Sequence, residues 1–131
     1  MKRFMCIIFA TLLMLAVCGC AQTNASENAE VTLIFICGDQ NIHAELSDEE
    51  AQSVIAILDG NSYDSILSGV PSCGFNKNIA LKVGNHTYAI ACDGCRYIQD
   101  LGNLRFFTVS QKEIAYIHGL FESYGGYFPC V

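Results

Sequence analysis

Three evenly spaced turn signals lie in the stretch Asn78–Val109, which reads NIALKVGNHTYAIACDGCRYIQDLGNLRFFTV. They are the dipeptides Gly84-Asn85, Asp93-Gly94 and Gly102-Asn103, spaced nine residues apart, and each separates two apolar runs. Two-residue turns that contain glycine match the twist of an antiparallel hairpin. The stretch therefore predicts a four-stranded meander with strands at residues 78–83, 86–92, 95–101 and 104–109.

The same turns predict which side chains share a face of the sheet. Counting outward from the turns gives the closing pairs Val83–His86, Cys92–Cys95 and Leu101–Leu104. Continuing outward places on one face the residues Leu81, Tyr88, Ile90, Tyr97 and Phe106. Asp100 and Arg105 then oppose each other on the other face, as an exposed pair worth about 0–1 kcal/mol.

The residues before this meander predict an N-terminal hairpin. Val31–Cys37 is apolar and rich in β-branched residues on both faces, as in a well-covered strand. Residues 38–41 have the composition of a turn, and residues 42–46 alternate as a return strand. Residues 61–76 show no clear period, and we expect them to form mostly a loop around Cys73.

Two capping boxes predict two helices, because a serine and a glutamate three residues later satisfy free backbone N–H groups. The first box is Ser47 with Glu50, and the second is Ser110 with Glu113, whose helix ends at Gly125-Gly126. The buried stripe of the second helix should consist of Ile114, Ile117, Leu120, Phe121 and Tyr124. The resulting order ββαββββα shows no parallel crossover. It predicts an α+β fold, with both helices packed on one face of an antiparallel sheet.

The first 20 residues have the layout of an export signal. Lys2 and Arg3 precede the apolar run Phe4–Val17, whose 14 residues fall short of the roughly 20 that a membrane-spanning helix needs. Small residues follow and end in Gly19-Cys20, and residues 21–30 are mostly polar. This arrangement resembles a bacterial lipoprotein signal peptide.

The resemblance implies that Cys20 becomes the mature N-terminus and carries a thioether-linked diacylglycerol. Two acyl chains hold a protein stably on a bilayer, whereas a single chain gives marginal binding. We therefore expect residues 1–19 to be removed, residues 20–30 to form a lipidated polar tether, and residues 31–131 to form a single domain. The lipid bilayer would be its first partner, on the extracytoplasmic face of a bacterial cell membrane.

The composition limits the remaining partners. The chain has 131 residues, 52% of them hydrophobic and 15% charged, which fits one folded core and excludes a disordered chain. It has 7 Lys+Arg against 13 Asp+Glu, for a net charge of −6. A nucleic-acid binder needs a basic face that releases phosphate counterions, so nucleic acid is not an expected partner.

The cysteines are the most informative residues of the mature domain. Two structural disulfides are predicted, as is usual outside the cytoplasm, among Cys73, Cys92, Cys95 and Cys130. Three pairings are possible, and those that tie the long loop and the C-terminal tail to the Cys92–Cys95 tip are favoured. Cys37 is the expected odd cysteine, packed as a small hydrophobe inside an apolar strand.

Two other interpretations of these cysteines remain open. Cys92-Asp93-Gly94-Cys95 has the C-x-x-C spacing of thiol–disulfide oxidoreductases, although a tight hairpin turn offers no helix N-terminus to lower a thiol pKa. Structural zinc normally takes two short-spaced pairs, and this chain has one. A zinc site would therefore have to complete the C-x-x-C pair with Cys73 and Cys130, or with His86 or His118.

The sequence contains no nucleophile elbow, metalloprotease helix, phosphate-binding loop or dinucleotide fingerprint. We therefore expect a non-enzymatic lipoprotein, with no cofactor, that presents a binding surface to a protein or a small ligand. Small disulfide-bonded lipoproteins of this build are often inhibitors, immunity factors or assembly partners. The alternative function is a thiol–disulfide oxidoreductase or a metal-binding protein that uses the Cys92-x-x-Cys95 pair.

Overall fold

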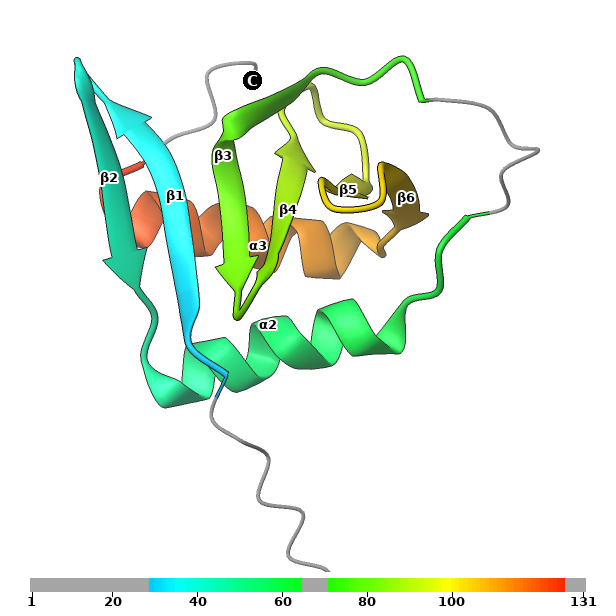
Figure 1. Cartoon of the computed structure of the whole chain (residues 1–131), viewed down its shortest axis with the longest axis horizontal. Helices are drawn as coiled ribbons and strands as arrows, with labels where there is room; N and C mark the ends of the chain where they lie inside the picture. Colours follow the sequence, from blue (N-terminus) through cyan, green and yellow to red (C-terminus); the bar gives the residue numbers. More distant parts are fainter. Residues whose placement is uncertain (1–28, 65–70, 127–131) are drawn as a thin grey trace, which may run out of the picture.

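The computed structural model describes residues 29–64 and 71–126. In these two ranges, six strands form one antiparallel sheet in the order β2-β1-β3-β4-β5-β6, accompanied by two helices (Figure 1). The elements are β1 (Val31–Cys37), β2 (Gln40–Glu45), α2 (Asp48–Gly60), β3 (Phe75–Val83), β4 (His86–Ala91), β5 (Tyr97–Asp100), β6 (Arg105–Thr108) and α3 (Gln111–Ser123). The predicted α+β class and the element order ββαββββα are confirmed.

The N-terminal hairpin and the meander join into a single sheet. β1 pairs with β2 across a turn at Gly38-Asp39, and on its other side β1 pairs antiparallel with β3. β3, β4, β5 and β6 are neighbours in sequence order, as the turn spacing predicted. The apolar run Val31–Cys37 is therefore an interior strand.

Both helices begin at the predicted capping boxes. Ser47 donates its backbone N–H (3.0 Å) and its hydroxyl (2.6 Å) to the Glu50 carboxylate. The Ser110 N–H donates to the Glu113 carboxylate (2.6 Å), and the Glu113 N–H donates to the Ser110 hydroxyl oxygen (3.2 Å). These serine contacts lower the pKa of Glu50 and the pKa of Glu113 below the ordinary value. Neither helix in residues 29–64 and 71–126 has the length and hydropathy needed to cross a bilayer.

One hydrophobic core joins both helices to the same face of the sheet. Alternate residues of β1, namely Val31, Leu33 and Phe35, point into this core and are at most 2% exposed. The helices contribute Ala51, Val54, Ile114, Ile117, Leu120 and Phe121. In Figure 1, α3 crosses behind the strands and α2 runs along their lower end. The predicted α3 stripe is thus buried at four positions, and Tyr124 packs against the core at its edge.

The predicted register is right at two of the three meander connections and wrong at the middle one. Val83 pairs with His86 as expected, and Asp100 pairs with Arg105 as expected. Between β4 and β5, however, Ile90 pairs with Ile98, because the connection is the loop Cys92–Arg96 instead of a two-residue turn at Asp93-Gly94. This β4–β5 loop shifts the pairing by one residue.

A one-residue shift moves every side chain of a strand to the opposite face. Ile98 and Phe107 therefore fill the core, at 0% and 3% exposure, in place of the predicted Tyr97 and Phe106. The prediction of an exposed Asp100 is also wrong, since its carboxylate is 1% exposed on the core side. Burial of Ile98 instead of the hydroxyl-bearing Tyr97 favours this register, whereas the exchange of Phe106 for Phe107 leaves the type of buried side chain unchanged.

Candidate functional site

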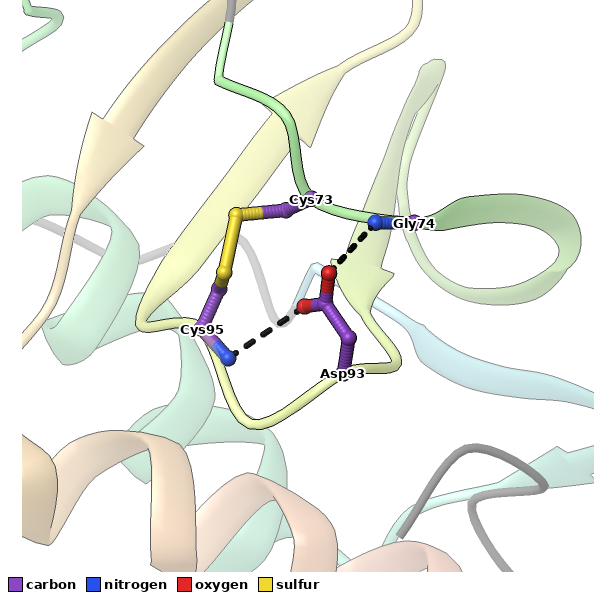
Figure 2. The surroundings of a disulfide bond; sticks show 4 residues. All are labelled: Cys73, Gly74, Asp93 and Cys95. Atoms are coloured by element: carbon purple, nitrogen blue, oxygen red, sulfur yellow. Dashed lines mark hydrogen bonds between the residues drawn. A yellow bond between two sulfur atoms is a disulfide. The ribbon is translucent and has the colours of Figure 1, made fainter.

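The β4–β5 loop carries a disulfide bond to the segment that leads into β3 (Figure 2). Cys95 is bonded to Cys73, with their Cα atoms 6.2 Å apart and a sequence separation of 22. The pair joins two half-buried positions on different segments of the chain. The long loop is therefore fastened to the hairpin tip, which is one of the arrangements favoured from the sequence.

Asp93 braces this disulfide from the side. Its Oδ2 accepts a hydrogen bond from the Gly74 N–H at 2.8 Å, and its Oδ1 accepts one from the Cys95 N–H at 3.3 Å (Figure 2). The Cys92 N–H also donates to the Gly74 carbonyl oxygen at 2.9 Å. The two oxygens of the Asp93 carboxylate thus accept hydrogen bonds from the backbone of Cys95 and from the residue that follows Cys73.

The two cysteines of the C-x-x-C motif occupy different environments. Cys95 is half-buried in the disulfide, whereas Cys92 is 2% exposed and belongs to the hydrophobic core. The Cys92 Sγ lies 3.6 Å from the Ile90 carbonyl oxygen. With Cys73 bonded to Cys95, two bridges among the four cysteines would leave Cys92 for Cys130. That second bridge stays a prediction, because Cys130 lies outside the described residues, as does Cys20.

The ligand atoms of the disulfide site form a compact cluster. The sulfurs of Cys73 and Cys95 and a carboxylate oxygen of Asp93 all lie within 4.8 Å of one another. In the described part of the chain this is the one such cluster of His, Cys, Asp or Glu, and neither His86 nor His118 belongs to it. Of the zinc ligands considered from the sequence, the structure therefore brings together Cys73 and Cys95 but not Cys92 or a histidine, and Cys130 lies outside the described residues.

A buried carboxylate that the sequence reasoning missed lies at the other end of β5. Asp100 accepts hydrogen bonds from the Tyr63 hydroxyl (2.5 Å), the Gly102 N–H (2.8 Å) and the Asn103 side-chain amide (2.9 Å). The Arg105 guanidinium carbon lies 4.5 Å from the centre of the Tyr63 ring. The hydrogen bond to Asp100 is the main cause that raises the pKa of Tyr63, and burial adds to it.

The Asp100 cluster fixes the chain after α2 against the β5–β6 turn, so we assign it a structural role. The turn residues Asp100, Gly102 and Asn103 give a sequence signal for an aspartate that binds its own backbone two residues on. Nothing in that local signal predicts the burial of Asp100, which depends on the register of β5. The distant donor Tyr63 also depends on that register.

Of the remaining candidate residues, His86 lies beside this cluster, with its Nδ1 4.0 Å from Asp100 Oδ2. Cys37 is exposed at the end of β1, so the expectation that it packs as a small hydrophobe is wrong. It forms no disulfide with a described residue, and its assignment as the odd cysteine stays a prediction. His118 is half-buried on α3, and burial lowers the pKa of its imidazole while the nearby Glu122 opposes that shift. Comparison with known proteins finds no matching family model, no matching curated protein and no matching solved structure.

Proposed function

We propose that this chain is an extracytoplasmic lipoprotein that holds a small, disulfide-stapled binding module on a bacterial membrane. Cys20 carries the lipid, residues 20–30 form the tether, and the folded domain binds a protein or small-ligand partner without catalysing a reaction. The observation that carries this proposal is the Cys73–Cys95 disulfide, braced by Asp93, at the tip of the sheet. Such bonds persist in the oxidising compartments that an exported protein reaches.

The position of the disulfide suits a surface that faces away from the anchor. The tether would join the domain at Val31, which pairs with Val83 next to the Gly84-Asn85 turn. From that turn, β4 runs to the β4–β5 loop at the other end of the sheet (Figure 1). Six extended residues span about 20 Å. We therefore place the partner-binding surface at the β4–β5 loop, distant from the lipid.

The pairing of Cys95 favours a structural role over a redox role. A thiol–disulfide oxidoreductase of the C-x-x-C type forms its disulfide between the two motif cysteines, here Cys92 and Cys95. In this protein, Cys95 is bonded to Cys73 instead. The Cys95 sulfur is therefore engaged in a bond outside the C-x-x-C motif. These features support a fastening function for the disulfide.

The lipid anchor can be tested with two matched cysteine variants expressed in a bacterial host. The mature wild-type protein should carry a diacylglycerol on Cys20, as measured by mass spectrometry of the N-terminal peptide, and should fractionate with membranes. Cys20→Ala should abolish both properties, whereas Cys18→Ala should keep both. A Cys20→Ala protein that still carries lipid and fractionates with membranes would contradict the anchor.

The binding surface can be tested by photo-crosslinking in intact cells of the native host. A photoreactive residue at exposed Arg96, in the β4–β5 loop, should give a discrete crosslinked species. The same group at exposed Asn85, at the opposite end of the sheet, should give none. Crosslinks from Asn85 alone would contradict the assignment of the surface, and fast alkylation of a Cys92–Cys95 dithiol in the native protein would favour the redox alternative.

A further inference from the structure

The cluster of Cys73, Asp93 and Cys95 brings a carboxylate oxygen close to two sulfurs, and a structural disulfide needs only the sulfurs. We propose that reduction of the Cys73–Cys95 bond converts this cluster into a binding site for one thiophilic divalent cation, with Zn²⁺ as the ion that fits best. The two sulfurs and one Asp93 oxygen are the three protein ligands, and the fourth position is open to water. The proposal does not require the lipid anchor, and its site lies in the same β4–β5 loop at which we place the partner-binding surface.

The distances fit such a site with small side-chain movements. Zinc binds cysteine sulfur at about 2.3 Å and carboxylate oxygen at about 2.0–2.2 Å, so two sulfurs on one tetrahedral zinc lie about 3.8 Å apart. The three ligand atoms already lie within 4.8 Å of one another. After reduction the sulfurs need to separate from bonding distance by less than 2 Å, estimated roughly from the same geometry.

Contacts that do not involve sulfur hold the backbone of the site in place. The Gly74 N–H binds Asp93 Oδ2, and the Cys92 N–H binds the Gly74 carbonyl oxygen. Both remain possible when the disulfide is open, because neither uses a cysteine side chain. The Asp93 carboxylate has two oxygens and more than two lone pairs, so it can accept these hydrogen bonds and also bind a cation.

The ligand types and their exposure favour zinc. Two thiolates are soft ligands, which zinc prefers to bind. With a carboxylate as the third ligand, the site has three protein ligands and one open position, an arrangement that zinc accepts. Cys73 and Cys95 are half-buried and Asp93 is exposed, so an ion and a water molecule can reach the site from solvent. Cys92 is not a ligand in this arrangement, which separates it from a C-x-x-C zinc knuckle.

Reduction of the Cys73–Cys95 disulfide requires a two-electron reductant, such as a dithiol. The dithiol gives two electrons and two protons to the Cys73–Cys95 bond, which breaks into two thiols, while the reductant becomes its own disulfide. Zn²⁺ then displaces the two thiol protons and forms two zinc–sulfur bonds. The disulfide and the cation are therefore alternative occupants of the same two sulfurs.

The test uses the full mature chain, reduced under anaerobic conditions with a phosphine that leaves no competing thiol. Zn²⁺ binding is measured by competition with a chromophoric chelator, and Co²⁺ serves as a spectroscopic probe of thiolate ligands. We expect one ion per reduced chain, with thiolate-to-cobalt charge transfer, and no such site in the oxidised chain. Cys73→Ser and Cys95→Ser should each weaken binding at least about tenfold, and Asp93→Asn should weaken it about tenfold.

Cys37→Ser is the matched control, because it removes an exposed thiol outside the cluster and should leave the affinity unchanged. The proposal is overturned by a reduced chain that binds no Zn²⁺, by equal binding to the oxidised chain, or by unchanged affinity in Asp93→Asn. If circular dichroism shows that the reduced chain unfolds, added Zn²⁺ should restore the folded spectrum. Failure of Zn²⁺ to restore it would also overturn the proposal.

Discussion

Two neighbouring hairpins of the meander carry the same kind of turn signal and fold differently. β3 and β4 are joined by Gly84-Asn85 in a two-residue turn, with Gly84 at a φ of +56°. β4 and β5 are joined by the loop Cys92–Arg96, with Gly94 at a φ of +78°. The glycine adopts a left-handed conformation in both, so the dipeptide alone does not set the length of the connection.

The difference follows from what each connection is attached to. In the first hairpin, Gly84 donates one hydrogen bond to the Glu30 carbonyl oxygen (3.3 Å), and the turn makes no covalent tie. The second connection is bonded to Cys73 and hydrogen-bonded to Gly74. The conformation of a turn therefore follows its local sequence where few other contacts constrain it. A disulfide to a distant segment can override that local preference.

The largest effect should come from a substitution that tests the β4–β5 register directly. Ile98→Ala removes a fully buried side chain and should lower the free energy of unfolding by about 4 kcal/mol. Gln99→Ala, on the other face, should change it by less than about 0.5 kcal/mol. Both values come from urea titration. A negligible effect of Ile98→Ala would mean that β5 has the register expected from a two-residue turn.

Loss of the disulfide should rank next. Cys73→Ser and Cys95→Ser each open a cross-link between residues 22 positions apart, and each should lower the free energy of unfolding by about 3 kcal/mol. Cys37→Ser should change it by less than about 0.5 kcal/mol, because that thiol is exposed and outside the disulfide. Equal effects of Cys37→Ser and Cys95→Ser in the same urea titrations would contradict stabilisation of the fold by the disulfide in the β4–β5 loop.

Asp100 should show a smaller but clear effect, since its burial is a consequence of the shifted register. Asp100→Ala removes the acceptor for Tyr63, Gly102 and Asn103 and should cost about 2 kcal/mol. Asn103→Ala removes one of these donors and should cost about 1 kcal/mol. If Asp100→Ala is neutral by thermal and urea unfolding, the carboxylate is exposed to water as the sequence first indicated.

The smallest effect concerns the helix caps, where the serine contacts are local and the Tyr124 hydroxyl adds one long-range hydrogen bond to Glu50 (2.7 Å). Glu50 and Glu113 have lowered pKa values in the folded protein, so near pH 4.5 the unfolded chain binds more protons. Their stabilisation is present above the ordinary pKa and is lost as the pH falls through the lowered folded values. The melting temperatures of Glu50→Gln and Glu113→Gln should therefore approach that of the wild type on acidification. A gap that widens toward low pH would show that the caps do not act through these carboxylates.

Sequence reasoning succeeded for features that a few adjacent residues determine. The boxes at Ser47 and Ser110 set both helix starts, and the Gly84-Asn85 turn set the β3–β4 register. It failed where residues far apart in the chain meet. The spacing of the cysteines left three pairings open, because the approach of Cys73 to Cys95 depends on the path of the intervening strands.

The wrong prediction of the β4–β5 register also arose from a contact between distant residues, and it inverted the predicted faces of both β5 and β6. Once the β4–β5 loop was counted as a two-residue turn, the faces of Tyr97, Phe106 and Asp100 were all inverted. Local composition could not correct this, since Tyr97-Ile98 and Phe106-Phe107 each offer two apolar residues in succession. The long-range disulfide at Cys95 constrains the connection between β4 and β5, and no local pattern signals that constraint.

The most direct test of that bond is disulfide mapping of the alkylated, unreduced protein after digestion with Asp-N and trypsin. Cleavage before Asp93 and after Lys77, Lys82 and Arg96 places the cysteines of this region on separate peptides. We predict that the peptide 93–96, which contains Cys95, is joined to the peptide 64–77, which contains Cys73. Joining of 93–96 to the peptide 83–92, which would link Cys95 to Cys92, would contradict the account.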